Sequence, residues 1–259
     1  MYWTSTAGQV EYRHRRDGAK NSAQGNDERD FVLCNRPASF DARGMIRAFV
    51  FDFDGLILDT ESPIIEAWAQ VHARAGLTCD QSEALDLIGE VDHDYDPWRA
   101  FPSNIDRNHL EEEHRTLTRA ITRQQPLLPG VRERLDEARV LGLRLAVASN
   151  SSHRHVDGHL QRLGLFAYFA TTRCRDDVSR GKPEPDVYRA VVAALGVEPH
   201  EAIAFEDSKA GVIAAKRAGL RCVAVPNNCT RHHDFSQADL LARSLAGFSL
   251  GELVGRFAG

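Results

Sequence analysis

The stretch IRAFVFDFDG, residues 46–55, decides the fold class of this chain. It is a short run of aromatic and β-branched residues that ends in a glycine turn, which is typical of a strand buried on both faces of a sheet. Similar runs recur at LRLAVASN (143–150), AIAFED (202–207) and RCVAVPN (221–227). We therefore expect these segments to be the strands of one buried sheet.

Segments with helical spacing of apolar residues separate these runs. They are HRHVDGHLQRLG (153–164), PDVYRAVVAALG (185–196) and SKAGVIAAKRAG (208–219). Each ends in a glycine, the residue that most often follows the last turn of a helix. Strands that alternate with helices of this length form βαβ units, so the sequence predicts an α/β fold with a parallel sheet covered by helices on both faces.

Residues 61–129 break this alternation. The segments ESPIIEAWAQVHARAG (61–76) and RNHLEEEHRTLTRAITRQ (107–124) have helical spacing, and no strand pattern lies between them. Because this part falls between the first and second strands of the sheet, we expect a helical insertion that forms a small domain over the sheet edge. The remaining residues, 45–60 and 130–259, then form the core domain.

The first 44 residues differ in character from the rest of the chain. They are polar and charged and lack an apolar period, which predicts a disordered tail over residues 1–44. Since the apolar pattern begins abruptly at Met45, this residue is a candidate for the natural start. A basic tail that binds a partner is the alternative.

Composition excludes several classes of partner. The 259 residues include 32 basic and 37 acidic side chains, a net charge of -5, so no global positive field favours nucleic acid or an anionic membrane. No apolar run approaches the roughly 20 residues of a membrane helix, and the N-terminus lacks a secretory signal. The five cysteines form no CxxC pair, which indicates reduced thiols. We expect a cytoplasmic monomer with neither nucleic-acid nor membrane partners.

Polar side chains gather where the predicted strands end. In an open parallel sheet, ligands bind at the carboxyl ends of the strands near the point where strand order reverses. Any one of these side chains could be a turn residue or a helix cap. Their joint occurrence in separate segments predicts one site, formed by Asp52 and Asp54, Ser149 and Asn150, Lys182, and Glu206 and Asp207.

These residue types suit phosphoryl transfer. A carboxylate is ionised at neutral pH, so Asp52 can attack phosphorus without a base to activate it. The attack brings an anion towards a phosphate dianion, and a Mg²⁺ ion held by Asp52, Glu206 and Asp207 would offset the repulsion.

Further groups would stabilise the transferred phosphate and move protons. Ser149, Asn150 and Lys182 are candidate phosphate-binding donors. Asp54 lies two residues beyond Asp52, so strand alternation places both side chains on the same side. There Asp54 can protonate the leaving alkoxide and then activate water.

Four segments together resemble a known family: FDFDGLILDTE (51–61), ASN (148–150), GKPEPDVY (181–188) and FEDSKAGVIAAKRAG (205–219). They resemble the motifs of the haloacid dehalogenase-like hydrolases, in the branch of β-phosphoglucomutase and phosphoglycolate phosphatase, over residues 45 to about 227. The resemblance implies a Rossmann-like core, a helical cap over residues 61–129, and Mg²⁺. It also implies that the backbone carbonyl of Asp54 is a metal ligand.

The same motifs indicate which branch of this family the chain resembles. Dehalogenases of this superfamily lack the second acidic residue, so Asp54 favours phosphoryl transfer. The resemblance places a histidine of the mutases at a position that is Ile64 here, and an arginine in a cap loop that is acidic here. That loop, LIGEVDHDYDPW (87–98), contains Asp92, Asp94 and Asp96. We expect a phosphatase acting on a small phosphorylated metabolite, because a closing cap excludes polymers.

Two alternatives remain open on the sequence alone. One is a sugar phosphomutase similar to β-phosphoglucomutase, and the other is a non-catalytic protein that binds a metabolite on the same fold. In the cap, His93, Trp98 and Arg99 are candidates for substrate specificity, although local packing or capping would explain them as well.

Overall fold

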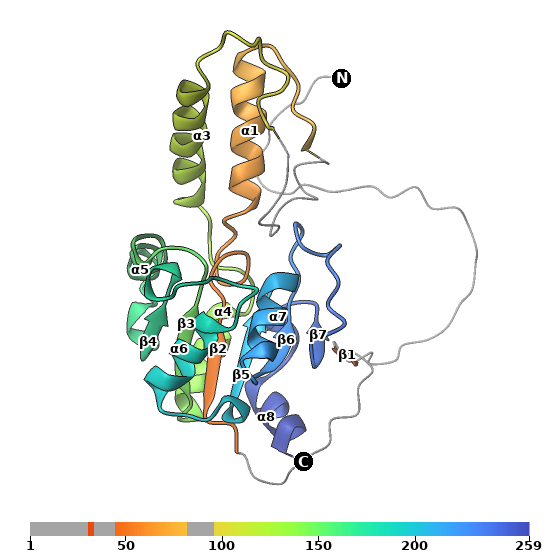
Figure 1. Ribbon diagram of the computed structural model, residues 1–259. Helices are drawn as coiled ribbons and strands as arrows, with labels where there is room; N and C mark the ends of the chain where they lie inside the picture. Colours follow the sequence, from red (N-terminus) through yellow and green to blue (C-terminus); the bar gives the residue numbers. More distant parts are fainter. Residues whose placement is uncertain (1–30, 34–44, 82–95, 259) are drawn as a thin grey trace, which may run out of the picture.

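One seven-stranded sheet forms the centre of the molecule, in the order β1-β7-β6-β5-β2-β3-β4 (Figure 1). A computed structural model describes residues 31–33, 45–81 and 96–258. The strands are β1 (Phe31–Leu33), β2 (Ala48–Phe51), β3 (Arg144–Ala148), β4 (Thr171–Arg173), β5 (Ala202–Glu206), β6 (Arg221–Ala224) and β7 (Leu240–Ala242).

The strand order contains one reversal, and it determines where a ligand can bind. From β2 the chain runs outward through β3 to β4, and it then returns to the other side of β2 for β5, β6 and β7. All these pairs are parallel, and β1 alone is antiparallel, to β7. The α/β prediction with a Rossmann-like parallel sheet is confirmed, and the reversal lies between β2 and β5.

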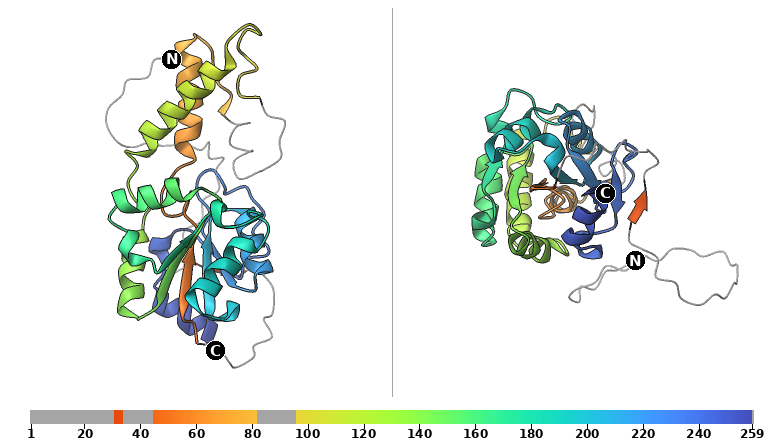
Figure 2. Two further views of the ribbon diagram at one scale, coloured as in Figure 1. Left: turned by 60° about the vertical axis from the view of Figure 1, so that its left-hand side comes forward. Right: turned by 90° about the horizontal axis from the view of Figure 1, so that it is seen from below.

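Helices cover both faces of the sheet, as Figure 2 shows. The predicted helices at 153–164, 185–196 and 208–219 are confirmed, and each is followed by a glycine at positive φ, of 68°, 62° and 89° respectively. The α-helices are α1 (Ser62–Arg74), α3 (Arg107–Thr122), α4 (Val131–Val140), α5 (His153–Arg162), α6 (Asp186–Leu195), α7 (Lys209–Arg217) and α8 (Leu250–Ala258), and short 3₁₀ turns lie at Phe166–Tyr168, Arg175–Asp177, Pro199–Glu201 and Leu245–Gly247.

Alternation along β2 builds two cores, one on each face. Phe49 and Phe51 pack into the cluster that includes residues of α4, α5 and α8, while Ala48 and Val50 pack into the cluster with α6 and α7. The ring of Phe51 stacks on that of Phe205 in β5, with centroids 4.8 Å apart. Burial of each such side chain contributes about 1.5–3 kcal/mol, which fixes the register of the central strands.

Helices α1 and α3 stand beyond the carboxyl edge of the sheet and pack on each other (Figure 1). They have their own apolar cluster, Val71, Trp98, Phe101 and Leu110. The helices expected within 61–76 and 107–124 are thereby confirmed, while the division of the chain into two domains stays a prediction.

The expectation of a disordered tail is wrong at Phe31–Leu33. This short apolar segment, FVL, forms β1 and pairs with β7, because an apolar β-former can add to an open sheet edge. The rest of residues 1–44 lies outside the described residues. Strands β4 and β7 and helices α4 and α8 were not predicted.

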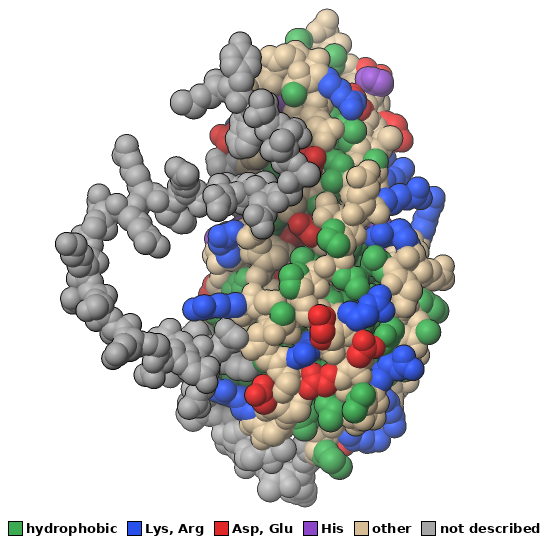
Figure 3. Space-filling model, turned by 180° about the vertical axis from the view of Figure 1, so that it is seen from behind, with side chains coloured by type: hydrophobic (Ala, Val, Ile, Leu, Met, Phe, Trp, Pro, Cys, Tyr) green, Lys and Arg blue, Asp and Glu red, His purple; other side chains and the backbone are tan. Residues whose placement is uncertain are grey.

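The described surface is mixed in charge. Figure 3 shows Lys and Arg side chains lying among acidic and apolar ones on the face opposite to that of Figure 1. Among the described residues, no helix combines the length and apolar character needed to span a bilayer.

The four described cysteines, Cys79, Cys174, Cys222 and Cys229, are free, and Cys34 lies outside this part.

Candidate active site

The strand reversal brings two acidic segments together. Asp52 and Asp54 follow β2, and Glu206 and Asp207 lie at the end of the adjacent strand β5. The intervening Phe53 is fully buried in the core, so alternation turns Asp52 and Asp54 to the same side. The turn after them is closed by Gly55 at φ +72°, where a Cβ atom would lie 2.4 Å from Asp207 Oδ2.

Three of these carboxylates form a cluster that could hold a cation. Oxygen atoms of Asp52, Glu206 and Asp207 lie within 4.8 Å of one another, and all three side chains are buried. Burial raises the pKa of Asp52 well above its ordinary value, against the lowering effect of Lys182, and burial and the neighbouring carboxylates likewise raise the pKa of Asp207. Such buried, mutually repelling hard oxygen donors suit a divalent cation such as Mg²⁺.

Lys182 is the one described ammonium within this cluster. Its Nζ lies 2.5 Å from Asp52 Oδ1 and 2.6 Å from Glu206 Oε1. Although burial lowers the pKa of Lys182, the two carboxylates raise it above the ordinary value, so the side chain stays charged. Glu206 also accepts a hydrogen bond from the hydroxyl of Tyr188. One positive charge among three carboxylates leaves a net negative charge for a metal ion to neutralise.

Asn150 holds the Lys182 segment in place. Its Oδ1 accepts from the Lys182 backbone N at 2.7 Å, and its Nδ2 donates to the Lys182 carbonyl at 3.1 Å. This pair of bonds joins the end of β3 to the loop that carries Lys182. Asn150 thereby fixes the position of the lysine in the site.

Asp54 accepts four hydrogen bonds from side chains. Its Oδ1 accepts from Thr60 Oγ1 and from His155 Nε2, each at 2.9 Å. Its Oδ2 accepts from Ser151 Oγ at 2.7 Å and Ser149 Oγ at 3.1 Å. Burial opposes ionisation, but the hydrogen bond and charge of His155 and the hydrogen bonds of Ser151 and Thr60 lower the pKa of Asp54 to about 2.

Two further polar residues of the site were not predicted, Glu61 and Asn227. Asn227 Nδ2 lies 2.8 Å from Asp207 Oδ2, 2.9 Å from Glu61 Oε2 and 3.1 Å from the Gly55 carbonyl. Burial raises the pKa of Glu61 to about 7, an effect that Asn227 opposes and that Asp54 and Asp59 reinforce. Asn227 follows β6, so it obeys the rule of polar residues at strand ends.

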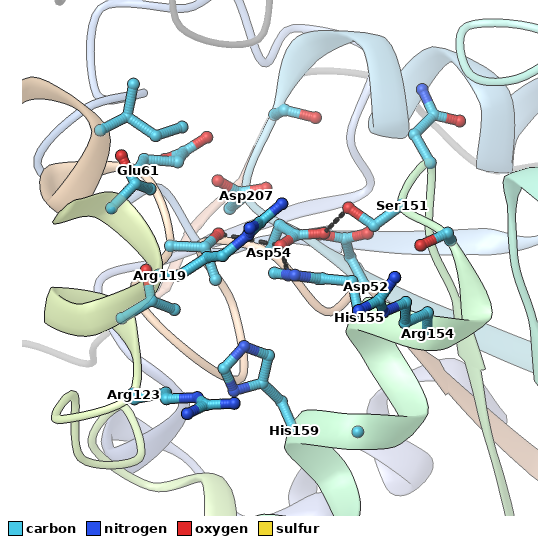
Figure 4. Close-up of a pocket in the computed structure, with 18 of the residues that line it drawn as sticks. Asp52, Asp54, Glu61, Arg119, Arg123, Ser151, Arg154, His155, His159 and Asp207 are labelled. Carbon is cyan, nitrogen blue, oxygen red and sulfur yellow. Dashed lines mark hydrogen bonds and ion pairs between the residues drawn. The ribbon is translucent and has the colours of Figure 1, made fainter. Parts of the chain in front are cut away.

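A cavity of about 1200 Å³ opens between the sheet edge and helices α1, α3 and α5. Figure 4 shows Asp52, Asp54 and Asp207 at one side of it. Of the predicted site residues, Asp52, Asp54, Asn150, Lys182 and Asp207 line this cavity. Ser149 and Glu206 are fully buried and contact the lining residues Asp54 and Lys182 instead. The structure therefore brings all seven predicted residues together.

The predicted specificity residues lie elsewhere or outside the described part. Trp98 is buried against His72 and Phe101 and does not line the cavity, and neither does Arg99. Local packing is thus the role that the structure gives Trp98. Asp96 forms an ion pair with Arg107 at 2.9 Å. Asp92, His93 and Asp94 lie outside the described residues, and Ile64 lines the cavity.

Comparisons with known proteins agree with this geometry. The family model of the haloacid dehalogenase-like hydrolases matches residues 46–219. YhcW of Bacillus subtilis, a protein assigned as a phosphatase, is 38% identical over 214 residues, which cover 81% of this chain and 97% of that protein. Hexitol phosphatase B of Escherichia coli is 32% identical over 216 residues, covering 81% of this chain and 97% of the relative.

Solved structures show the same fold. The crystal structure of CbbY from Rhodobacter sphaeroides with bound phosphate is 31% identical, with a TM-score of 0.63, and the match covers 78% of this chain and 96% of that one. A CbbY variant was also solved with xylulose-1,5-bisphosphate, at the same TM-score and coverage.

Proposed function

The chain belongs to the haloacid dehalogenase-like hydrolases and is a phosphatase, and from this premise we propose that it hydrolyses the phosphate monoester of a small metabolite through a phosphorylated Asp52. The observation that carries the proposal is the buried cluster of Asp52, Glu206 and Asp207 around Lys182 at the strand reversal. A nucleophilic carboxylate beside cation ligands is what this reaction requires.

In the first step, a carboxylate oxygen of Asp52 forms a bond to phosphorus, and the bond from phosphorus to the leaving oxygen breaks. Asp54 gives its proton to that oxygen. In the second step, Asp54 takes a proton from water, the water oxygen attacks phosphorus, and the bond to Asp52 breaks to release phosphate. Both Asp52 and Asp54 line the cavity, which supports their paired roles.

Asp54 must gain a proton before it can act as an acid, because its pKa of about 2 keeps it ionised at neutral pH. The negative charge of an entering phosphate favours the protonated form of a nearby carboxyl group. His155 Nε2, 2.9 Å from Asp54 Oδ1, is placed to supply that proton. Burial lowers the pKa of His155, but Asp54 raises it above the ordinary histidine value, which supports a protonated ring in the free enzyme.

We propose that Ser149, Asn150 and Lys182 act in phosphate binding, Lys182 by contact, and Ser149 and Asn150 through the groups that they hold. Lys182 supplies positive charge next to the attacking oxygen. Ser149 and Asn150 hold Asp54 and the Lys182 backbone, so they orient the groups that contact the phosphate. Fixed donors of this kind lower the barrier because charge grows on the phosphoryl oxygens during transfer.

Mg²⁺ is the proposed cofactor, held by the side chains of Asp52, Glu206 and Asp207 and by the backbone carbonyl of Asp54. When bound, it would neutralise the carboxylates and orient the phosphoryl group. Helices α1 and α3 would form the cap over the cavity. We further propose a cytoplasmic monomer without nucleic-acid or membrane partners, which rests on the sequence alone.

The experiment is phosphate release from a panel of sugar and acid phosphates, with and without Mg²⁺, by the parent chain and by Asp52→Asn. We expect release that requires Mg²⁺ and is abolished in the variant. Full activity of Asp52→Asn would end the nucleophile assignment. Conversion of β-glucose 1-phosphate to glucose 6-phosphate without free phosphate, in the presence of a trace of the bisphosphate, would show a phosphomutase instead.

A further inference from the structure

The cavity has a second polar end that the reaction above does not use. Arg119 of α3 and Arg123, the residue directly after α3, line it, and Figure 4 shows Arg123 beside His159 of α5. Arg162, one turn further along α5, also lines it. Arg119 and Arg123 lie four residues apart, about 6 Å along the helix axis, so both fall on the face that looks into the cavity.

Arg119 and Arg123 differ from other arginines of α1 and α3. Arg74, Arg107 and Arg115 each form an ion pair with a carboxylate. Within the described part of the chain, Arg119 and Arg123 form no ion pair with a carboxylate. Both side chains are exposed. Arginines that meet no carboxylate where they line a cavity present their donors to a ligand.

Two arginines, Arg123 and Arg162, bring positive charge to His159 at this end of the cavity. Arg162 donates from Nε to His159 Nδ1 at 3.3 Å, which directs its guanidinium towards the histidine. Burial and the charges of His155, Arg162 and Arg123 lower the pKa of His159 to about 4. Two guanidinium groups that line the same end of a cavity favour an anion there.

The spacing along α5 sets the reach of a ligand. His155 contacts Asp54 at 2.9 Å. His159 follows one turn later, about 6 Å along the axis, and Arg162 about 10 Å. Between them Gly158 lines the cavity, and a Cβ atom there would meet nothing within 4 Å, so the path between the two ends is open.

We propose that Arg123, His159 and Arg162 form a second anion-binding subsite, so that the substrate is a phosphate monoester carrying another anionic group, phosphate or carboxylate. The spacing of the two groups is set by the roughly 6–10 Å of helix axis between His155, which contacts Asp54, and the subsite residues of α5. This proposal rests on the proposed function, because it assumes that the ester is cleaved at Asp52. The anionic group binds through the guanidinium donors, and the rest of the substrate lies along Gly158.

The test compares three probes: glucose 6-phosphate, 6-phosphogluconate and glucose 1,6-bisphosphate. They share a six-carbon phosphate ester and differ in the group at the far end, which is uncharged, a carboxylate or a phosphate. The quantity measured is the preference, the ratio of kcat/KM for each two-anion probe to that for glucose 6-phosphate. The variants are Arg123→Gln and Arg162→Gln. The matched control is Arg115→Gln, because Arg115 does not line the cavity and is ion-paired with Glu112.

We expect the parent to prefer a two-anion probe, and each subsite variant to lower that preference about 10- to 100-fold through a higher KM, because one charged hydrogen bond is lost. Arg115→Gln should keep it. The better of the carboxylate and phosphate probes identifies the group. Cleavage of all three without preference, or an unchanged preference in both variants, would overturn the subsite while leaving the proposed function intact.

A binding measurement separates the two proposals further. In an Asp52→Asn background, calorimetric titration should show 6-phosphogluconate or the bisphosphate binding more tightly than glucose 6-phosphate, and Arg123→Gln should remove the difference. If the parent cleaves neither these probes nor any ester of the wider panel but this difference is present, the proposed reaction fails and the subsite stands. Equal binding of the three probes would refute the subsite without reference to turnover.

Discussion

Replacement of Gly211 by alanine tests how tightly Glu206, a proposed metal ligand, is held. Gly211 lies in the first turn of α7, and a Cβ atom there would lie 1.8 Å from Oε2, 2.0 Å from Cδ and 2.3 Å from Oε1 of Glu206. Glu206 cannot easily move, because its side chain is fully buried and its Oε1 is bound by Lys182 and Tyr188. Either α7 or the carboxylate must shift.

The expected cost has two parts. Forcing extra volume into a packed region costs about 1–3 kcal/mol. If Glu206 turns away instead, a buried ion pair with Lys182 is broken, and such losses cost about 3–5 kcal/mol. We therefore expect Gly211→Ala to lower the free energy of unfolding by about 1–5 kcal/mol, and to weaken Mg²⁺ binding or activity about 10- to 100-fold, because the carboxylate loses its orientation.

The assay is urea denaturation with and without Mg²⁺, together with phosphatase activity. Gly255→Ala is the matched control, since a Cβ atom at this position in α8 meets nothing within 4 Å. This control should be neutral or more stable by up to about 1 kcal/mol, because alanine favours helix over glycine. A Gly211→Ala protein with parental stability and activity would refute the close packing of α7 on Glu206.

Three further predictions concern charge. Lys182→Met should cost about 3–5 kcal/mol of stability without Mg²⁺ and less with it, as urea denaturation in the two buffers would show, because the buried carboxylates lose their cation; equal losses in the two buffers would contradict it. His155→Asn should slow cleavage of alkyl phosphates by about 100-fold but p-nitrophenyl phosphate much less, since only a poor leaving group needs the proton; equal slowing of both would refute this. His153 lies 2.9 Å from Asp157 and 2.7 Å from Asp177, and although burial lowers its pKa, these carboxylates raise it above 6.5. Its stabilisation is complete below pH 6.5 and is lost as pH rises through the raised value, so His153→Gln should melt below the parent at pH 5.5 and close to it at pH 9; a gap that widens with pH would contradict the assignment.

The sequence predicted those parts of the fold in which burial follows a regular period. The stretch 48–51 and its counterparts are buried on both faces, so continuous apolar runs marked them as strands. The strands β4, TTR, and β7, LLA, have three residues each, too few for any period to show. Pairing with longer neighbours, which is a tertiary effect, makes them strands.

Some residues of the candidate site were predicted from sequence motifs, and others became evident only from the fold. Asp52, Lys182 and Asp207 were predicted because each lies in a motif at the edge of the sheet. His155 was missed because three histidines occur in α5, and only the packing of that helix decides which of them reaches Asp54. Glu61 directly precedes α1, and it was missed as a site residue because only the fold brings Asn227, which follows β6, beside it.

The phosphorylation of Asp52 is the central claim, and rapid acid quenching of the enzyme during turnover tests it most directly. Mass spectrometry of the peptides should find one added phosphoryl group on the segment that carries Asp52, and none when Asp52→Asn is treated in the same way. A phosphoryl group on any other residue, or steady hydrolysis by the Asp52→Asn protein, would contradict the account.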